Sequence, residues 1–326
     1  MADPTGVTQG TLYVPGFRAN LNLAPQQTTS RLLACVDNEL AYETPGQFFN
    51  ADDVGTTDPD DATARVANSP EGFVDVTRRF GAFAGFRDGK FLDSQDKARQ
   101  LEDPTDPTMA AMMAGQGRKR DQAIIAAAFA APYLQGNNQA YTLGSANANV
   151  IAVNDGTAHQ NETLVAKGGG YGLTLGKLIE TKLALDNSEL DEMLPGDTAN
   201  NYYLACTSEQ LQDLLLTIPA TSSYYNQVQA LVEGTLSTFV GFNFIRMPRT
   251  GISAIPKAAG SYIRKCIAFH KRAIVYRARP IVDTHVAPRA DKEFNWYAFY
   301  KAEHGAVRRY DAGVWEVDCG ETLIGT

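Results

Sequence analysis

The stretch 106-DPTMAAMMAGQGRKRDQAIIAAAFAAP-132 predicts one long helix in the middle of the chain. Asp106 can cap its N-terminus, Pro107 suits the first turn, where no amide partner is needed, and Pro132 ends it. A helix over residues 107–131 would be about 37 Å long at ~1.5 Å per residue. It carries no set of metal ligands and no catalytic group, so we expect it to serve as a rigid structural rod.

The surface of this helix is only partly apolar. Methionine and isoleucine side chains recur at intervals of three and four residues, which indicates one stripe packed against the rest of the protein. The charged run 118–121 interrupts the stripe and predicts a solvated patch. Gly115 and Gly117 each cost roughly 1 kcal/mol relative to alanine inside a helix, which points either to bending or to close packing there.

Length and charge narrow the class of protein. The chain has 326 residues and a formal net charge of −8. This length allows two or three packed regions, and a protein that reads DNA sequence would normally carry a basic stripe, which this chain lacks. The sequence contains no apolar run of about 18 residues that could span a membrane. The first ten residues, MADPTGVTQG, lack a secretory pattern, so we expect synthesis in the cytoplasm.

Residues that could carry chemistry form no recognisable constellation. The four cysteines are far apart and form no C-x-x-C pair, which favours buried, reduced thiols, and no two histidines have metal-ligand spacing. The run Gly172–Lys177 departs from a phosphate loop, with three residues between its glycines and Leu178 after the lysine. A nucleophile pair of Cys266 with His304 stays open, as it would in almost any chain with four of each. We expect no catalytic residue, no metal site and no cofactor.

Residues 46–92 predict a projecting β segment. The acidic, turn-rich run 46–70 lacks the ligand spacing of a calcium loop, so a solvated loop is favoured. The following FVDVTRRFGAFAGFRDGKFL (73–92) is strand-like and aromatic, and Asp88–Gly89 predicts a two-residue hairpin turn, in which both positions need positive φ. Exposed aromatic β structure needs a partner to cover it.

Helices and strands alternate between residues 171 and 250, which predicts a compact α/β or α+β unit. Thr174 caps a helix whose apolar positions 175, 178, 179 and 183 are expected on one face, and residues 202–206 predict a buried strand. Thr207 with Gln210 forms a capping box, and Gly234 ends a further helix. From residue 262 onward the pattern is almost all strand, with a three-residue hairpin expected at 311–313.

Several separated segments resemble, in the expected order, the major capsid proteins of tailed bacteriophages. An acidic lead-in before the long helix matches, as do the aspartate, paired isoleucines and phenylalanine of its second half. The later runs match an internal segment, the strand around Cys266 and the closing strands of that family. The matching segments are 91-FLDSQDKARQLEDPTDP-107, 115-GQGRKRDQAIIAAAF-129, 222-SSYYNQVQALVEGTLSTFVGFNFIRMPR-249, 264-RKCIAFHKRAIVYR-277 and 304-HGAVRRYDAGVWEVDC-319.

The resemblance implies an α+β Hong Kong 97-like capsid fold. Its parts would be an N-terminal arm (1–45), an extended loop (46–95), a peripheral domain (96–170) with the spine helix 107–131, an axial domain (171–284) and a return to the peripheral domain (285–326). The candidate inter-subunit contacts are Phe80, Phe83, Phe86, Asp88, Gly89 and Lys90. The rigid rod then has a purpose, because a capsid subunit must be a thin, wide plate.

The implied function is that of a structural protein without enzymatic turnover. Many copies would assemble as hexamers and pentamers of an icosahedral shell that encloses packaged double-stranded DNA without reading its sequence. Portal, scaffolding and cement proteins are further expected partners, the virion is the expected location, and synthesis is expected in the bacterial host cytoplasm, with no membrane involved. Two alternatives stay open: an encapsulin-like nanocompartment shell and a soluble α/β hydrolase.

Overall fold

The structure is a computed structural model, and it describes the chain in separate stretches. These are residues 26–40, 46–59, 61, 72–92, 105–135, 141–143, 149–155, 166–167, 170–188, 190, 201–219, 222, 224–258, 261–279 and 283–321. Within them, strands form a five-stranded, a six-stranded, a four-stranded and a two-stranded sheet. None of the helices in these stretches is long and apolar enough to cross a membrane.

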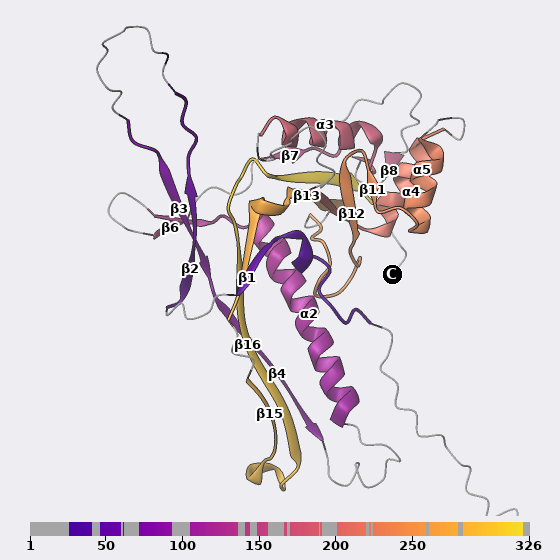
Figure 1. Cartoon of the computed structure of the whole chain (residues 1–326). Coiled ribbons are helices and arrows are strands. Elements are labelled where there is room, and N and C mark those ends of the chain that lie inside the picture. The colour runs from indigo at the N-terminus through magenta and orange to yellow at the C-terminus, as the bar shows by residue number, and fades with distance from the viewer. Residues whose placement is uncertain are drawn as a thin grey trace, which may run out of the picture.

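The five-stranded sheet is built around its longest strand, β16. The strands are β1 (Asp37–Leu40), β4 (Ala84–Leu92), β14 (Ile274–Ala278), β15 (Asp283–Pro288) and β16 (Trp296–Arg308). β4 pairs antiparallel with one edge of β16, and β14 and β15 pair with successive stretches of the other edge. Figure 1 shows β4, β15 and β16 reaching together away from the lobe that holds the shorter helices.

The long helix α2 (Thr105–Phe129) lies beside this sheet (Figure 1). Near its start Met112 packs against Tyr300 of β16, and near its end Ile124 packs in a cluster with Ile274 of β14. The helix predicted over 107–131 is therefore confirmed, with both ends two residues earlier. The expected cap by Asp106 lies outside the described side chains.

The six-stranded sheet and three helices form the lobe at the upper right of Figure 1. Its strands are β7 (Val150–Ile151), β10 (Tyr202–Cys206), β11 (Thr238–Phe239), β12 (Phe242–Arg246), β13 (Ile263–His270) and β17 (Val314–Gly320). Its helices are α3 (Leu175–Asp186), α4 (Ser208–Thr217) and α5 (Tyr225–Glu233). Leucines of α3 and α4 share one core with β10, β13 and β17.

The helix ends in this lobe follow the local sequence. The amide of Lys177 donates to Thr174 Oγ1 over 3.2 Å, and the Thr207 amide donates to Gln210 Oε1 over 2.9 Å. Gly234 follows α5 with φ of 87°, a left-handed conformation that glycine adopts without strain. The predicted caps and the predicted strand 202–206 are therefore confirmed.

A β-hairpin projects from the body of the molecule at the upper left of Figure 1. It consists of β2 (Phe48–Val54) and β3 (Val76–Ala82), and β5 (Tyr133–Gln135) and β6 (Tyr141–Leu143) extend its sheet. The remaining elements are the pair β8 (Ala166–Lys167) and β9 (Gly170–Tyr171), and the short helices η2 (Leu33–Cys35), η3 (Lys271–Ala273) and η4 (Ala290–Lys292).

The turn predicted at Asp88–Gly89 is wrong. Both residues lie inside β4, where they pair with Tyr300 and Phe299 of β16. Gly89 serves close packing instead, because a Cβ there would lie 2.0 Å from the hydroxyl oxygen of Tyr297. The local preference for a turn is overridden here because β4 forms a continuous ladder of hydrogen bonds with the long strand β16.

The hairpin predicted at 311–313 is also wrong. The flanking strands β16 and β17 belong to different sheets, so this connection carries the chain from one sheet to the other. The return segment 285–326 expected from the resemblance thus divides between two sheets, with β17 paired to β13. Similarly, β14 belongs to the expected axial segment in sequence but pairs with β16.

The face predicted for α3 is wrong in part. Leu175 and Leu178 are buried, whereas Ile179 and Leu183 are exposed, at 38 % and 61 %. The inner face is completed instead by Leu185 and by polar side chains that are fully buried. Helical periodicity predicts which residues share a face of the helix. It does not predict whether polar residues on that face find hydrogen-bond partners in the core.

Candidate assembly surfaces

The described N-terminal segment is fixed on the long helix by one carboxylate. Asp121 of α2 has no exposed surface, and it accepts hydrogen bonds from Ser30 Oγ (2.5 Å) and from the amides of Arg31 (3.0 Å) and Leu32 (3.1 Å). The side-chain amide of Gln27 donates to it as well. The solvated patch predicted for 118–121 is therefore wrong at Asp121, because this charge is buried and paired with donors from a distant segment.

The other end of the helix is tied to the projecting hairpin. The Arg308 side chain is fully buried, and its guanidinium donates to the carbonyl oxygen of Ala128 (2.7 Å) and to Asp311 (2.6 Å). Asp311 also pairs with Arg79 of β3 at 2.8 Å. These charge-assisted bonds hold the base of the hairpin at a set angle to α2.

Beyond its base the hairpin exposes apolar side chains. Val54 and Val76 face each other across the two strands, and they are 66 % and 61 % exposed. Phe73, just before β3, is fully exposed. A single chain gains nothing from apolar groups in water at the end of a projecting hairpin, so this part has the properties of a contact surface.

The three phenylalanines predicted as inter-subunit contacts pack within their own chain. Phe80 is only 6 % exposed, Phe83 lies 5.0 Å from Phe49, and the ring of Phe86 lies 4.5 Å from that of His304, all ring distances being between centroids. In this conformation they offer little surface to a neighbour, and their effect is to fix where β3 and β4 lie.

Asp88, Gly89 and Lys90 lie further along β4, toward the far end of the five-stranded sheet. Lys90 is exposed, and its ammonium group lies 3.7 Å from the Asp88 carboxylate. The structure thus separates the six predicted residues into packed phenylalanines and a partly exposed group on β4. Contact of either group with another subunit stays a prediction.

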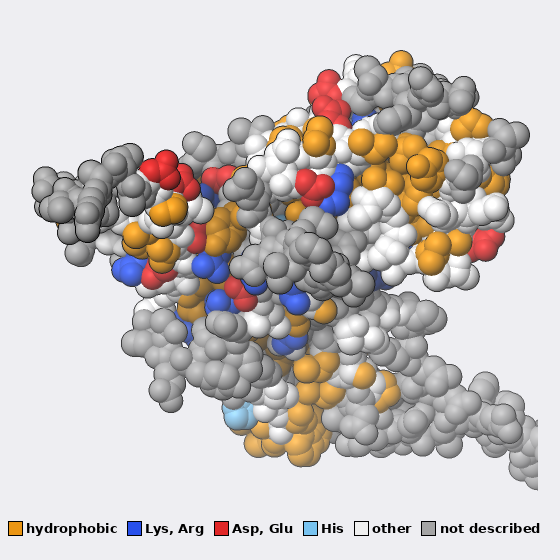
Figure 2. All heavy atoms as spheres, turned by 45° about the horizontal axis from the view of Figure 1, so that its top comes forward, with side chains coloured by type: hydrophobic (Ala, Val, Ile, Leu, Met, Phe, Trp, Pro, Cys, Tyr) orange, Lys and Arg blue, Asp and Glu red, His pale blue; other side chains and the backbone are white. Residues whose placement is uncertain are grey.

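Another apolar surface, at the far end of the same sheet, was missed by sequence reasoning. Phe91, Phe294 and Trp296 are 49 %, 68 % and 40 % exposed there. The Arg289 guanidinium lies over the ring of Tyr297 at 5.3 Å from its centroid. Figure 2 shows hydrophobic side chains gathered at this end of the molecule and on the lobe with α3, α4 and α5. The aromatic density of 294–300 was a usable signal, but the pattern alone did not tell exposed from buried rings.

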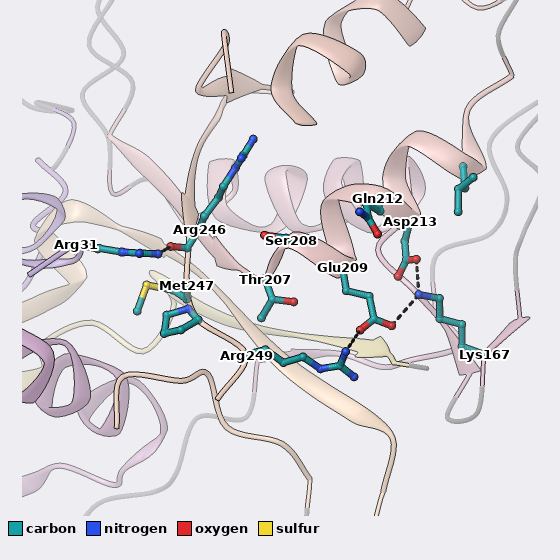
Figure 3. Close-up of a pocket in the computed structure, with 12 residues that line it drawn as sticks. Arg31, Lys167, Thr207, Ser208, Glu209, Gln212, Asp213, Arg246, Met247 and Arg249 are labelled. Atoms are coloured by element: carbon teal, nitrogen blue, oxygen red, sulfur yellow. Dashed lines mark hydrogen bonds and ion pairs between the residues drawn. The ribbon is translucent and has the colours of Figure 1, made fainter. Parts of the chain in front are cut away.

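A hollow of about 820 Å³ opens beside the start of α4 (Figure 3). Glu209 lies between Lys167, at 3.1 Å, and Arg249, at 2.9 Å, and Lys167 also pairs with Asp213. A buried carboxylate, Glu321, pairs with Arg249 at 3.4 Å. Lys167 and Arg249 are therefore paired with carboxylates, whereas Arg31 and Arg246, which also line the hollow, donate to backbone carbonyl oxygens.

The remaining candidate chemistry is inert in the folded chain. Cys266 lies in the core cluster of the six-stranded sheet, whereas His304 lies on β16, so the structure does not bring this pair together. A hydrogen bond with Cys319 and burial raise the pKa of the Cys266 thiol, and burial lowers the pKa of His304 to about 4. No group of three potential metal ligands occurs among the residues that the structure describes.

The run Gly172–Lys177, at the start of α3, serves the packing of the subunit itself. Lys177 is completely buried, and its ammonium group donates to the carbonyl oxygens of Tyr171 (3.1 Å), Gly172 (3.0 Å) and Asp318 (2.8 Å). All three N–H donors are thereby used. A phosphate group would have to displace backbone carbonyls, which agrees with the rejection of a phosphate loop from its spacing.

Comparison with solved structures identifies the fold. The chain is similar to the capsid of Ralstonia phage GP4, with a TM-score of 0.67, 11 % identity and 100 % of both chains covered. It is also similar to the capsid of cyanophage Pam1 (TM-score 0.66, 11 % identity, 99 % and 100 % covered) and to that of cyanophage P-SCSP1u (0.65, 13 %, 99 % and 97 %). The fold is the α+β Hong Kong 97-type capsid fold, as the resemblance implied.

A family model described as "Phage capsid protein" matches residues 10–321. The chain therefore belongs to the phage capsid protein family. It is a structural protein of the virion capsid, and the expectation of a major capsid protein without enzymatic activity is confirmed, whereas the hydrolase alternative is wrong. No curated protein matches the sequence.

Proposed function

We propose that this chain assembles with many copies of itself as hexamers and pentamers of an icosahedral head that encloses packaged double-stranded DNA. The observation that carries the proposal is the placement of exposed apolar groups. They lie at the ends of elements that project from the body: Phe73 and Val76 on the hairpin, and Phe294 and Trp296 on the long sheet. Surfaces at opposite extremities suit heterologous contacts, in which one patch meets a different patch of the next copy and rings can close.

The parts of the fold support a division of labour within such a shell. Residues 1–45 would form the arm, the hairpin within 46–95 the extended loop, 96–170 the peripheral domain around α2, and 171–284 the axial domain. The final segment 285–326 would serve both regions, because β16 and β17 lie in different sheets. Asp88, Gly89 and Lys90 would contribute to contacts along the exposed part of β4.

The proposal extends to partners and place of synthesis. A formal net charge of −8 disfavours tight binding of DNA, so the shell would enclose DNA without binding it sequence-specifically. Portal, scaffolding and cement proteins would bind to the shell. Synthesis would occur in the cytoplasm of the bacterial host.

Electron microscopy of the expressed chain, alone and with the products of its neighbouring genes, tests the proposal. We expect closed shells with ring-shaped capsomers, and nuclease-protected DNA in particles formed with the packaging proteins. A chain that stays monomeric in both settings would overturn the proposal. Shells that hold an enzyme instead of DNA would support the encapsulin-like alternative.

Removal of the outer part of the projecting hairpin, residues 56–74, tests whether this part is needed for assembly but not for folding. The Gly55 amide donates to the Asp75 carbonyl oxygen over 2.7 Å, so a short glycine-serine link can replace residues 56–74 without disturbing the hairpin base. We expect a soluble subunit with unchanged thermal unfolding that forms no shells. A deletion of 50–90 is a poor test, because it removes Phe80 and β4, which pack in the subunit itself.

A further inference from the structure

The connection between β16 and β17, residues 308–311 with the sequence RRYD, is bound to more of the molecule than the two sheets that it joins. The Arg308 guanidinium donates to the carbonyl oxygen of Ala128 at the end of α2. The side-chain amide of Asn149, just before β7 of the six-stranded sheet, donates to the carbonyl oxygen of Asp311 over 2.7 Å. The connection is therefore fixed both to the long helix and to the lobe built on the six-stranded sheet.

Strand β3 of the projecting hairpin is bound to the same connection. The Arg79 guanidinium donates to both carboxylate oxygens of Asp311, over 3.0 and 2.8 Å, and to the carbonyl oxygen of Arg308 over 3.1 Å. A two-pronged contact between a guanidinium and a carboxylate fixes the relative orientation of the two groups as well as their distance. Arg79 therefore limits how β3 can turn relative to the connection.

The other strand of the hairpin, β2, is bound there as well. The carbonyl oxygen of Asp52 accepts a hydrogen bond from the Arg309 guanidinium over 2.8 Å. The carboxylate of Asp53 accepts one from the Tyr310 hydroxyl over 2.7 Å. All four residues of the connection thus contact the hairpin, and they do so through both of its strands.

A second fixed point lies at the root of the hairpin, where β3 passes β16. A Cβ at Gly305 would lie 2.3 Å from the carbonyl oxygen of Ala82 and 2.8 Å from a ring atom of Phe49. A hairpin held only there would be free to tilt, whereas two fixed points set its direction. At ~3.4 Å per residue Val54 lies about 20 Å along β2 from Phe48, so a tilt of ~10° would move it by roughly 3.5 Å. Side chains in contact are separated by about 4 Å, so such a tilt is enough to break a contact.

We propose that residues 308–311 couple the direction of the projecting hairpin to the lobe built on the six-stranded sheet, and that this coupling sets the curvature of the shell. The inference rests on the proposed shell-forming function. Heterologous contacts close only when the angle between the two contacting patches has the right value. One such patch would include Val54 and Val76 on the hairpin, and the other patches belong to the body. Arg79 and Tyr310 are then positioning residues, because they set this angle from outside the contact itself.

Two adjacent arginines on β3 give a matched test in assembled shells. Arg79 holds the connection, whereas Arg78 pairs with Asp52 on the other strand of the hairpin at 2.7 Å. We expect R79A to widen the distribution of shell diameters in electron micrographs at least about twofold, because an undefined angle permits closure at several sizes. R78A should give the wild-type distribution. Equal distributions for R79A, R78A and wild type would overturn the role in curvature.

The variant Y310F tests the same point through β2 with less risk to folding, since it removes one hydroxyl and keeps the ring. We expect it to widen the diameter distribution in the same direction as R79A, by a smaller factor. Urea denaturation of each unassembled variant shows whether its subunit still folds. If R79A fails to fold, an unchanged distribution for Y310F overturns the role in curvature.

Amide hydrogen exchange of the unassembled subunit tests the coupling without assembly. N149A removes a hydrogen bond between the lobe and the connection while Arg79 and Asp311 stay in place. We expect it to speed exchange across β2 and β3 at least about threefold, although Asn149 belongs to a different part of the molecule. The control Q122A, at an exposed position of α2, should leave this exchange unchanged.

Unchanged exchange of β2 and β3 in N149A would overturn the coupling while leaving the proposed function intact. A wild-type chain that never assembles would overturn the proposed function and the role in curvature. The exchange experiment would still decide whether residues 308–311 link the hairpin to the lobe.

Discussion

Asp121 is a carboxylate without exposed surface that accepts hydrogen bonds from Ser30 and from the amides of Arg31 and Leu32. A buried charge is tolerated when several donors replace its water shell. These hydrogen bonds offset the cost of burying the carboxylate, and they fix the position of a segment that is far away in sequence. Arg308 plays the corresponding part at the other end of α2, through Ala128 and Asp311.

Replacement of Asp121 by alanine should therefore detach the N-terminal segment from the helix. We expect D121A to lower the free energy of unfolding by about 3 kcal/mol, because several buried donors lose a charged acceptor. Urea denaturation of the unassembled subunit measures this. The neighbouring exposed side chain supplies the control, since Q122A should change stability by less than about 0.5 kcal/mol. Equal effects of the two changes would contradict the role of Asp121.

His304 makes the stability of the subunit depend on pH. Burial lowers the pKa of its side chain to about 4, from the usual 6.5, so the unfolded chain binds the extra proton first as pH falls. The stabilising contribution is complete above pH 6.5 and is lost between pH 6.5 and 4, amounting to about 3 kcal/mol in full. Asp318 acts in the opposite direction, because burial raises the pKa of its carboxyl to about 6.

The two contributions are separated by H304F, which keeps an aromatic ring next to Phe86 and Tyr276. We expect the variant to lose less stability than wild type between pH 6.5 and 4. Parallel urea titrations at these two pH values give the difference. An unchanged pH dependence would show that His304 is protonated as readily in the folded subunit as in the unfolded one.

At the scale of elements, α2 acts as the support on which separate segments are assembled. Its two glycines have different surroundings. A Cβ at Gly115 would meet only side-chain atoms, at 3.8 Å or more, whereas a Cβ at Gly117 would lie 3.1 Å from the backbone of Thr29 and Ser30. Close packing, rather than bending, therefore accounts for Gly117.

This difference predicts opposite outcomes for two alanine substitutions on one helix. G115A should raise the free energy of unfolding by about 0.5 to 1 kcal/mol, through helix propensity alone. G117A should lose that gain, because the new methyl group pushes the segment 28–30 away. Tryptic cleavage after the exposed Arg31 reports the displacement, and we expect it to be faster in G117A and unchanged in G115A. Equal cleavage rates would refute the packing argument.

At the scale of the whole molecule, stability and assembly depend on different apolar residues. Phe80 and the cluster around Ile124 are buried in the subunit, whereas Phe294 and Trp296 are exposed at the end of the long sheet. Phe294 also has a φ of 58°, a left-handed value that is uncommon for a large side chain. We expect this exposed ring to contact another subunit in the shell.

F294N tests this separation, because asparagine accepts left-handed φ values and removes the apolar ring. We expect unfolding of the isolated subunit to change by less than about 0.5 kcal/mol, while shell formation requires several-fold more protein. The matched change F80N, at a buried ring, should instead destabilise the subunit itself by about 3 kcal/mol. Light scattering for assembly and urea denaturation for stability distinguish the two. Normal assembly of F294N would remove this end of the sheet from the contact surfaces.

Local patterns identified the elements whose signals lie within a few residues. The long helix, the cap at Thr174, the capping box at Thr207 and the glycine after α5 depend on hydrogen bonds made inside one turn. Such signals can be read without knowledge of the neighbours. The family resemblance added the fold class, because separated segments matched in order.

The errors share one cause, which is that the deciding contact comes from far away in the chain. Asp88–Gly89 has the composition of a turn, but β16 continues the ladder through it. Asp121 looks like a surface charge, but the segment around Ser30 buries it. The hairpin expected at 311–313 fails because its two strands find partners in different sheets.

The sequence by itself determined that this chain contains a long chemically inert helix, no recognisable catalytic constellation and the order of segments found in phage capsid proteins. Only the tertiary structure decided which phenylalanines are packed and which are exposed, and which buried charges hold the parts together. The physical reason is that periodicity and capping are local, whereas burial, pairing and charge balance depend on which distant segments meet.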